Sequence, residues 1–221
     1  MSDTGHAPVG SRRRVRIVIR DVDDAHALLV RSKVMTLTAT GAVPALVTAV
    51  AGEVAGSWWS HPDGQHVYRI AEALSHRDDV LVVKLVAGKV TFVHRELWPA
   101  LLRAVTDAPW RSRAHAALSL DAQRLLARVE DDDELRLADA LPADATAAQK
   151  KQLAKSKDTL ERSLLVYSQQ EHTERGHHAT VLRSWNAWAE AARVKPSNET
   201  AEAARRAVVD VCHGQPTALS N

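Results

Sequence analysis

The strongest structural signal in the chain is a pair of short apolar runs between Val80 and His94. Both runs, residues 80–86 and 89–94, are rich in β-branched side chains, and Ala87-Gly88 lies between them. Such side chains favour extended backbone, and glycine permits the positive φ angles of a tight turn. The sequence therefore predicts a β-hairpin over residues 80–94. Helical spacing of apolar residues predicts a helix on either side of it, over residues 65–76 and 95–105.

The second half of the chain repeats this order. An alanine- and lysine-rich helix is predicted over residues 147–162, followed by two strands within 163–168 and 178–182. Further helices are predicted over 184–193 and 200–211. In both halves a tryptophan follows the hairpin. The two halves share no residue-by-residue identity, so the repetition is one of pattern.

Helices followed by a two-stranded hairpin resemble the winged-helix fold, in which the last helix before the hairpin enters a DNA major groove and the hairpin is the wing. The resemblance rests on element order and applies to both halves. It implies an α+β, mostly helical protein with two winged-helix-like modules. Modules of this kind bind either DNA or proteins.

The chain divides into five predicted segments. A five-residue acidic run, residues 130–134, is the main feature of the predicted linker between the modules. The segments are a flexible tail (1–14), a first module with flanking helices (15–129), the acidic linker (130–146), a second module with a C-terminal helix (147–211) and a loose C-terminus (212–221). Helices over 21–33, 43–50 and 112–129 are also predicted within the first module.

Composition restricts the class of protein. A hydrophobic content of 45% over 221 residues supports a packed core, and the net charge of +2 is nearly neutral. The single cysteine, Cys212, excludes an internal disulfide and a cysteine-rich zinc site. No run approaches the ~20 apolar residues of a membrane span. We therefore expect a cytoplasmic protein that makes no contact with a membrane.

Charge is distributed unevenly between the modules. Residues 36–105 carry six Lys/Arg and six Asp/Glu, whereas residues 147–195 carry nine Lys/Arg and five Asp/Glu, a net charge of +4. Lys151 and Lys155 are four residues apart and share a helix face, where they would neutralise neighbouring phosphates. The residues predicted to contact double-stranded DNA are Lys150, Lys151, Lys155, Lys157, Gln152, Arg175 and His177. The alternative is that these lysines only solvate an exposed helix.

A second candidate site is the corner Trp58-Trp59-Ser60-His61-Pro62. Because adjacent side chains point in different directions, we expect one indole in a core and the other at the surface. The exposed indole would stack on a base or anchor a protein partner. The other four tryptophans are expected to fill cores, since the chain has a single phenylalanine.

Motifs for catalysis are weak. The glycines form neither a dinucleotide-binding fingerprint nor a P-loop, and the chain contains no G-x-S-x-G elbow. His61 and Asp63 could act as a general acid–base pair, but a histidine this close to an aspartate in sequence is common by chance. The histidines between His172 and His178 do not have a recognised metal-ligand spacing. We expect no catalytic residue, metal or cofactor. The predicted function is non-catalytic or regulatory DNA binding, with a protein-interaction scaffold or a glycosylase-like DNA-repair enzyme as alternatives.

Overall fold

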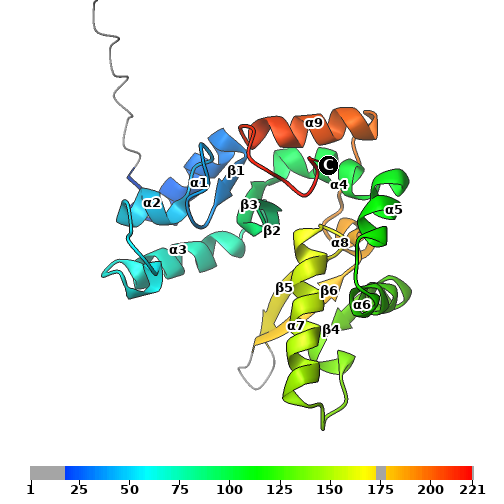
Figure 1. Ribbon diagram of the computed structural model, residues 1–221. Helices are drawn as coiled ribbons and strands as arrows, with labels where there is room; N and C mark the ends of the chain where they lie inside the picture. Colours follow the sequence, from blue (N-terminus) through cyan, green and yellow to red (C-terminus); the bar gives the residue numbers. More distant parts are fainter. Residues whose placement is uncertain (1–17, 173–177, 221) are drawn as a thin grey trace, which may run out of the picture.

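The computed structural model describes residues 18–172 and 178–220. This part of the chain is an α+β protein with more helix than strand and two three-stranded antiparallel sheets (Figure 1). The predicted tail, residues 1–14, lies outside the described residues. No helix within the described ranges is long and apolar enough to cross a membrane.

The first half begins with α1, whose first turn is capped by the carboxylate of Asp21, which accepts a hydrogen bond from the Asp24 amide at 2.9 Å. The predicted hairpin and the helix before it are confirmed. The sheet has the order β1-β3-β2. The elements are α1 (Val22–Ser32), β1 (Val34–Thr36), α2 (Leu46–Ala51), the 3-10 helix η1 (Trp58–Ser60), α3 (Gly64–Ser75), β2 (Val80–Val86) and β3 (Lys89–His94).

The second half contains a sheet of the same order, β4-β6-β5. In both halves a helix precedes a hairpin and a further helix follows it, so the repeated order predicted from the sequence is present. The elements are η2 (Arg95–Leu97), α4 (Trp98–Val105), α5 (Ala108–Ala116), α6 (Leu120–Asp132), β4 (Glu134–Arg136), η3 (Leu137–Ala140), α7 (Ala147–Arg162), β5 (Tyr167–His172), β6 (His178–Arg183), α8 (Trp185–Ala191) and α9 (Ala201–Val211).

The predicted acidic linker, residues 130–146, is folded structure. Its acidic run ends α6 and begins β4, which pairs with β6. Asp133 accepts a hydrogen bond from the Ser184 hydroxyl at 2.6 Å, and Glu134 pairs with Arg183 at 2.7 Å. The charge of Glu134 is thus neutralised across the sheet, and the carboxylate of Asp133 is held by a hydroxyl. The predicted helix over residues 112–129 is two helices, and the second of them, α6, packs on α7 in the second half.

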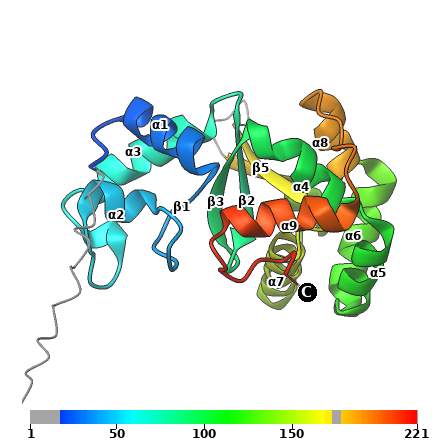
Figure 2. The ribbon, with the colours of Figure 1, turned by 90° about the horizontal axis from the view of Figure 1, so that it is seen from above.

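The first sheet is buried on both faces. Leu81, Val83 and Val93 face the larger core, which is shared with the second half, whereas Met35 and Phe92 face the smaller core under α1, α2 and α3. Seen from above, β2 and β3 lie between these three helices and the pair formed by α4 and α9 (Figure 2). The nearly continuous apolar run of β2 follows from this double burial.

Four tryptophans fill the larger core, as predicted. Trp98, Trp110, Trp185 and Trp188 are each no more than 6% exposed. Two of these indoles satisfy their N–H groups with backbone carbonyls. Trp98 Nε1 donates to Val93 at 3.1 Å, and Trp185 Nε1 donates to Leu164 at 2.6 Å. These two indoles therefore pack without leaving a buried donor unpaired.

The tip of the first hairpin forms backbone hydrogen bonds with the C-terminal segment. Ala87 and Gly88 have φ angles of 50° and 66°, as a tight hairpin turn requires. The Ala87 N–H donates to the Pro216 carbonyl at 2.7 Å, and Val86 pairs with Thr217.

The predicted loose C-terminus, residues 212–221, is therefore packed as far as it is described. Leu219 is 4% exposed, and Cys212 is fully buried. Burial raises the pKa of the Cys212 thiol to about 12, so this group is protonated at neutral pH. It is an unreactive core residue.

The packing of this segment predicts a difference between two leucines. Leu219→Ala removes buried apolar volume and should lower the free energy of unfolding by about 2–4 kcal/mol. Leu120, which is 69% exposed, provides the matched control, and Leu120→Ala should change it by less than about 0.5 kcal/mol. Urea unfolding followed by tryptophan fluorescence measures both. Equal effects would show that the C-terminal segment does not pack in solution.

Candidate functional site

A cleft of about 770 Å³ lies between the two halves of the chain. Its floor is the part of the β2–β3 surface that α3 leaves uncovered, formed by Val82, Val90 and Phe92. One wall comes from η1 and α3, and the other comes from α7 and β5. Figure 1 shows these elements on either side of the central hairpin. Apolar clefts with a few polar groups are typical ligand sites.

The first wall is aromatic. The rings of Trp58 and Trp59 stack with centroids 4.1 Å apart, and Tyr68 lies 5.5 Å from Trp59. Trp59 is 61% exposed and Tyr68 41% exposed, whereas Trp58 packs against the smaller core. One indole thus faces a core and the other faces solvent, as predicted. The expectation that their side chains diverge is wrong, because the 3-10 turn of η1 stacks the two rings.

The turn after this corner is tightly built. A Cβ atom on Gly64 would lie 2.7 Å from the Trp58 carbonyl oxygen, so only glycine lets α3 begin against η1. His61 Nδ1 accepts a hydrogen bond from the Asp63 backbone N–H at 3.2 Å. His61 does not line the cleft, and its imidazole instead holds the local turn.

A buried ion cluster connects the floor of the cleft to the second wall. Lys84, on β2, places Nζ 2.5 Å from Asp158 and 2.6 Å from Glu161, both on α7. Lys157 lies 3.2 Å from Glu161, and the Ser168 hydroxyl donates to Glu161 at 2.5 Å. The Glu161 side chain is only 8% exposed. The cluster therefore joins the first sheet to α7 through one buried carboxylate, Glu161, and its partly exposed partners.

The cluster remains ionised at neutral pH. Burial disfavours the charged form of Glu161, but hydrogen bonds from Lys84 and Ser168 and the charge of Lys157 outweigh it and lower the pKa of this carboxyl. Burial likewise opposes the charge of Lys84, and its two carboxylate partners outweigh it and raise the pKa of the amine. Glu161 and Lys84 therefore stay charged because each is paired with groups of opposite charge.

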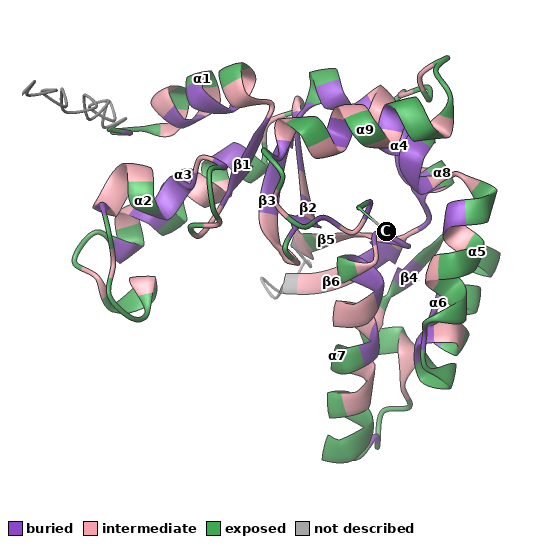
Figure 3. Ribbon diagram, turned by 45° about the horizontal axis from the view of Figure 1, so that its top comes forward, coloured by how far each residue is buried: buried purple, intermediate pink, exposed green. Residues whose placement is uncertain are grey.

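Three of the predicted DNA-contacting lysines are free. Lys150, Lys151 and Lys155 are exposed, and within the described residues none of them forms an ion pair. They lie on the first half of α7, which projects from the body of the protein and is largely exposed (Figure 3). Lys151 and Lys155 are one helical turn apart, as predicted.

Two other predicted contacts are engaged elsewhere. Gln152 donates to Asp121 on α6 at 2.9 Å, and Lys157 pairs with Glu161 inside the cleft. Asp121 is 31 residues from Gln152, so helical spacing could not reveal that contact, whereas Glu161 is four residues after Lys157 on the same helix. Arg175 and His177 lie outside the described residues, and their predicted role stays a prediction.

Comparisons of the chain with protein-family models, with curated proteins and with solved structures found no match. What the protein does must therefore follow from its own cleft and its own exposed charges. These features border each other, because α7 carries the free lysines at one end and lines the cleft at the other.

Sequence reasoning missed Tyr68, Lys84 and Glu161 as site residues. A signal for Lys84 was present, since it is the one charged residue in the apolar run 80–86. A charge inside a strand that is otherwise buried requires a partner. Glu161 gave no such signal, because its environment depends on a strand far away in the chain.

The ion cluster predicts a large effect of a single substitution. Lys84→Met leaves Glu161 buried with Lys157 as its one remaining cation, and should lower the free energy of unfolding by about 2–3 kcal/mol. Lys33, which pairs with Glu96 at 3.3 Å on the surface, is the matched control. Lys33→Met should lower the free energy of unfolding by less than about 1 kcal/mol. Urea unfolding at neutral pH distinguishes the two.

The pH dependence of stability provides a second readout. Because the folded pKa of Glu161 lies below its ordinary value of 4.5, its contribution is present above that value and is lost as the pH falls through the folded pKa. The free energy of unfolding should therefore fall less steeply between pH 7 and pH 3 for Lys84→Met than for the wild type. Parallel curves would contradict the assigned ion pairs.

Proposed function

We propose that the protein binds double-stranded DNA through α7, as a pair of winged-helix-like modules. The observation that carries this proposal is the set of exposed, unpaired lysines on the projecting half of α7, namely Lys150, Lys151 and Lys155. This helix directly precedes a hairpin, which is the position of the recognition helix in the winged-helix fold.

The repeated topology supports the assignment of the modules. In each half a helix and a short strand precede a later helix and a hairpin, although the first half has α2 in addition. The three strands of each half form one sheet in which the third strand lies in the middle. By this correspondence α3 and α7 occupy equivalent positions. The boundary between the modules then falls before α6, since this helix packs on α7.

The second module is the better placed for DNA. The outward face of α3 lines the cleft through Tyr68 and Glu72, and the tip of the first hairpin is covered by Arg162 and Pro216. Neither element of the first module is open to a duplex in the way that the projecting half of α7 is. We therefore assign the first module a structural role, in which it packs against the second module.

The chemistry of α7 favours phosphate contacts without base readout. Ala147 and Ala148 are exposed before the lysines and Ala154 is exposed among them, and these small side chains let the helix approach a groove closely. Gln152, the residue predicted to address base edges, is bound to Asp121. We therefore propose binding that depends little on DNA sequence, with Arg175 and His177 as further contacts at the second hairpin.

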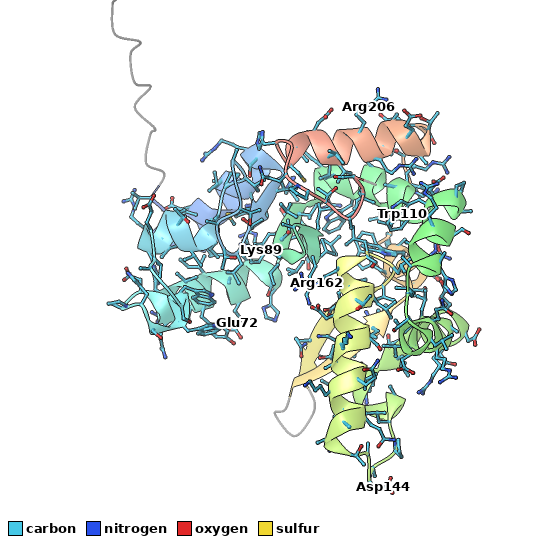
Figure 4. The ribbon with its side chains drawn as sticks, viewed as in Figure 1. Glu72, Lys89, Trp110, Asp144, Arg162 and Arg206 are labelled. Carbon is cyan, nitrogen blue, oxygen red and sulfur yellow. The ribbon has the colours of Figure 1, made fainter. Side chains whose placement is uncertain are left out.

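Titration of a labelled duplex over a series of salt concentrations tests the proposal. The logarithm of the association constant should fall linearly with the logarithm of the salt concentration, and Lys151→Ala/Lys155→Ala should reduce the slope by about 2. Arg206→Ala is the control, because Arg206 is an exposed cation on α9, at the opposite end of the molecule from Asp144 (Figure 4). It should leave the slope unchanged.

Two outcomes would contradict DNA binding by α7. One is the absence of binding at low salt. The other is an equal loss of affinity in the Arg206→Ala control and the double lysine variant, which would indicate a diffuse effect of net charge.

The exposed aromatic wall favours a second candidate function, a protein-interaction scaffold. Trp59 and Tyr68 offer exposed rings at the rim of an apolar cleft, and such rings are frequent anchors in interfaces. The glycosylase-like alternative has less support in the described part of the chain, because His61 is held in its local turn and lies outside the cleft lining.

Trp59→Ser separates the two leading candidates. If the cleft is a protein-binding surface, this variant should lose a partner that the wild type retains from cell extract, while its affinity for duplex DNA stays within about twofold, since α7 is untouched. The double lysine variant should show the opposite pattern. Retention of no partner by the wild type would count against the scaffold.

A further inference from the structure

Three side chains of metal-ligating types meet at one edge of the first sheet, outside the lining of the cleft. His26 lies on α1, Asp79 lies in the turn before β2, and His94 is the last residue of β3. One potential ligand atom from each lies within 4.8 Å of the other two. The three residues come from distant parts of the chain, so the fold alone brings them together.

Backbone hydrogen bonds fix the segments that carry these side chains. The His94 N–H donates to the Lys33 carbonyl at the end of α1, and the Arg95 N–H donates to the Asp79 carbonyl, both at 2.9 Å. Val80 pairs with His94 in the ladder between β2 and β3. The cluster is therefore held by secondary structure on all sides, as a preorganised site requires.

The imidazole of His94 lacks the partners that a buried polar group needs. Its side chain is 8% exposed, and Nδ1 has no hydrogen-bond partner within the described residues. Nε2 lies 3.8 Å from Asp79 Oδ2, beyond hydrogen-bonding distance. Buried groups of this kind are normally paired, and an unpaired one indicates a missing ligand or a functional role.

We propose that His26, Asp79 and His94 bind a Zn²⁺ ion. Two imidazoles and one carboxylate form a typical three-residue zinc set, with a fourth position left for water. His26 and Asp79 are 17% and 24% exposed, so solvent reaches the cluster from one side.

The distances fit the ion after a small adjustment. Zinc bonds of about 2.0–2.1 Å in a tetrahedron place neighbouring ligand atoms about 3.3 Å apart. His26 Nε2 and His94 Nε2 lie 2.7 Å and 3.8 Å from Asp79 Oδ2, on either side of that value. Both distances to Asp79 thus lie within about 0.6 Å of the value for a tetrahedral site, and the two histidine ligand atoms lie within 4.8 Å of each other. On binding, His26 exchanges its hydrogen bond to Asp79 for a bond to the metal.

Asp79 is also held by a neighbouring cation that is not one of the proposed ligands. Arg77 Nε lies 3.6 Å from the other carboxylate oxygen, Oδ1. This arrangement keeps Asp79 oriented while Oδ2 faces the two histidines.

The ion would connect α1 to the edge of the hairpin, so its binding should be coupled to the stability of the first half of the chain. This role is separate from DNA contact by α7 and does not depend on it. Zinc should therefore raise the melting temperature whether or not DNA is present.

Titration of untagged, chelator-treated protein with Co²⁺ and then Zn²⁺ tests the proposal. One Co²⁺ per chain should produce the visible absorption of a tetrahedral complex, and Zn²⁺ should abolish it by displacement. At a zinc concentration 100 times the dissociation constant, the melting temperature should rise by roughly 5–10 °C.

Variants assign the ligands. Asp79→Asn and His26→Gln should each weaken metal binding by roughly 100-fold or more, exceeding the effect of losing an outer-shell partner, and circular dichroism without metal verifies that each variant is folded. His115→Ala, which removes an exposed histidine on α5, should bind as the wild type does. So should His177→Ala/His178→Ala, which removes two of the three histidines of the other cluster in the sequence.

The proposal is overturned if the wild type binds neither metal. It is equally overturned if both ligand variants retain wild-type affinity, or if binding is lost in the His177→Ala/His178→Ala variant and kept in His26→Gln.

Discussion

The burial of both faces of the hairpin β2–β3 is the constraint on which the rest of the structure depends. Residues that alternate along β2 belong to two different cores, one beneath α1, α2 and α3 and one shared with the second half of the chain. A strand with water on one face would carry polar side chains at every second position. Because β2 carries none but Lys84, both halves must pack against it.

Lys84 is the exception that shapes the candidate site. Its amine leaves the apolar surface of β2 to meet Asp158 and Glu161, which turns the inner end of α7 toward the first half. The outer end of the same helix is left free, with its lysines in solvent. One helix thus serves as a structural contact at one end and as a charged surface at the other. The inner end of α7 lines the cleft, and the outer end carries the lysines of the proposed DNA contact.

Local rules predicted the elements well and their partners poorly. The hairpin, α3, α7 and α9 follow from side-chain spacing within short windows, and the buried tryptophans follow from their size. The acidic run at residues 130–134 was mistaken for a linker, because two of the groups that hold it, the Ser184 hydroxyl and the Arg183 guanidinium, lie about 50 residues further along. The hydrogen bond of Gln152 was missed for the same reason, since its partner Asp121 lies on another helix.

The bond between the first hairpin and residues 216–217 has a consequence for biosynthesis. Synthesis at 5–20 residues per second would complete β3 roughly 6–25 s before Pro216 and Thr217 are added. During that interval one apolar face of the sheet has no cover from the larger core, because α4, α7 and α9 are made later. The first half therefore cannot finish folding as an independent unit on the ribosome. An uncovered apolar face favours aggregation of the nascent chain during this interval.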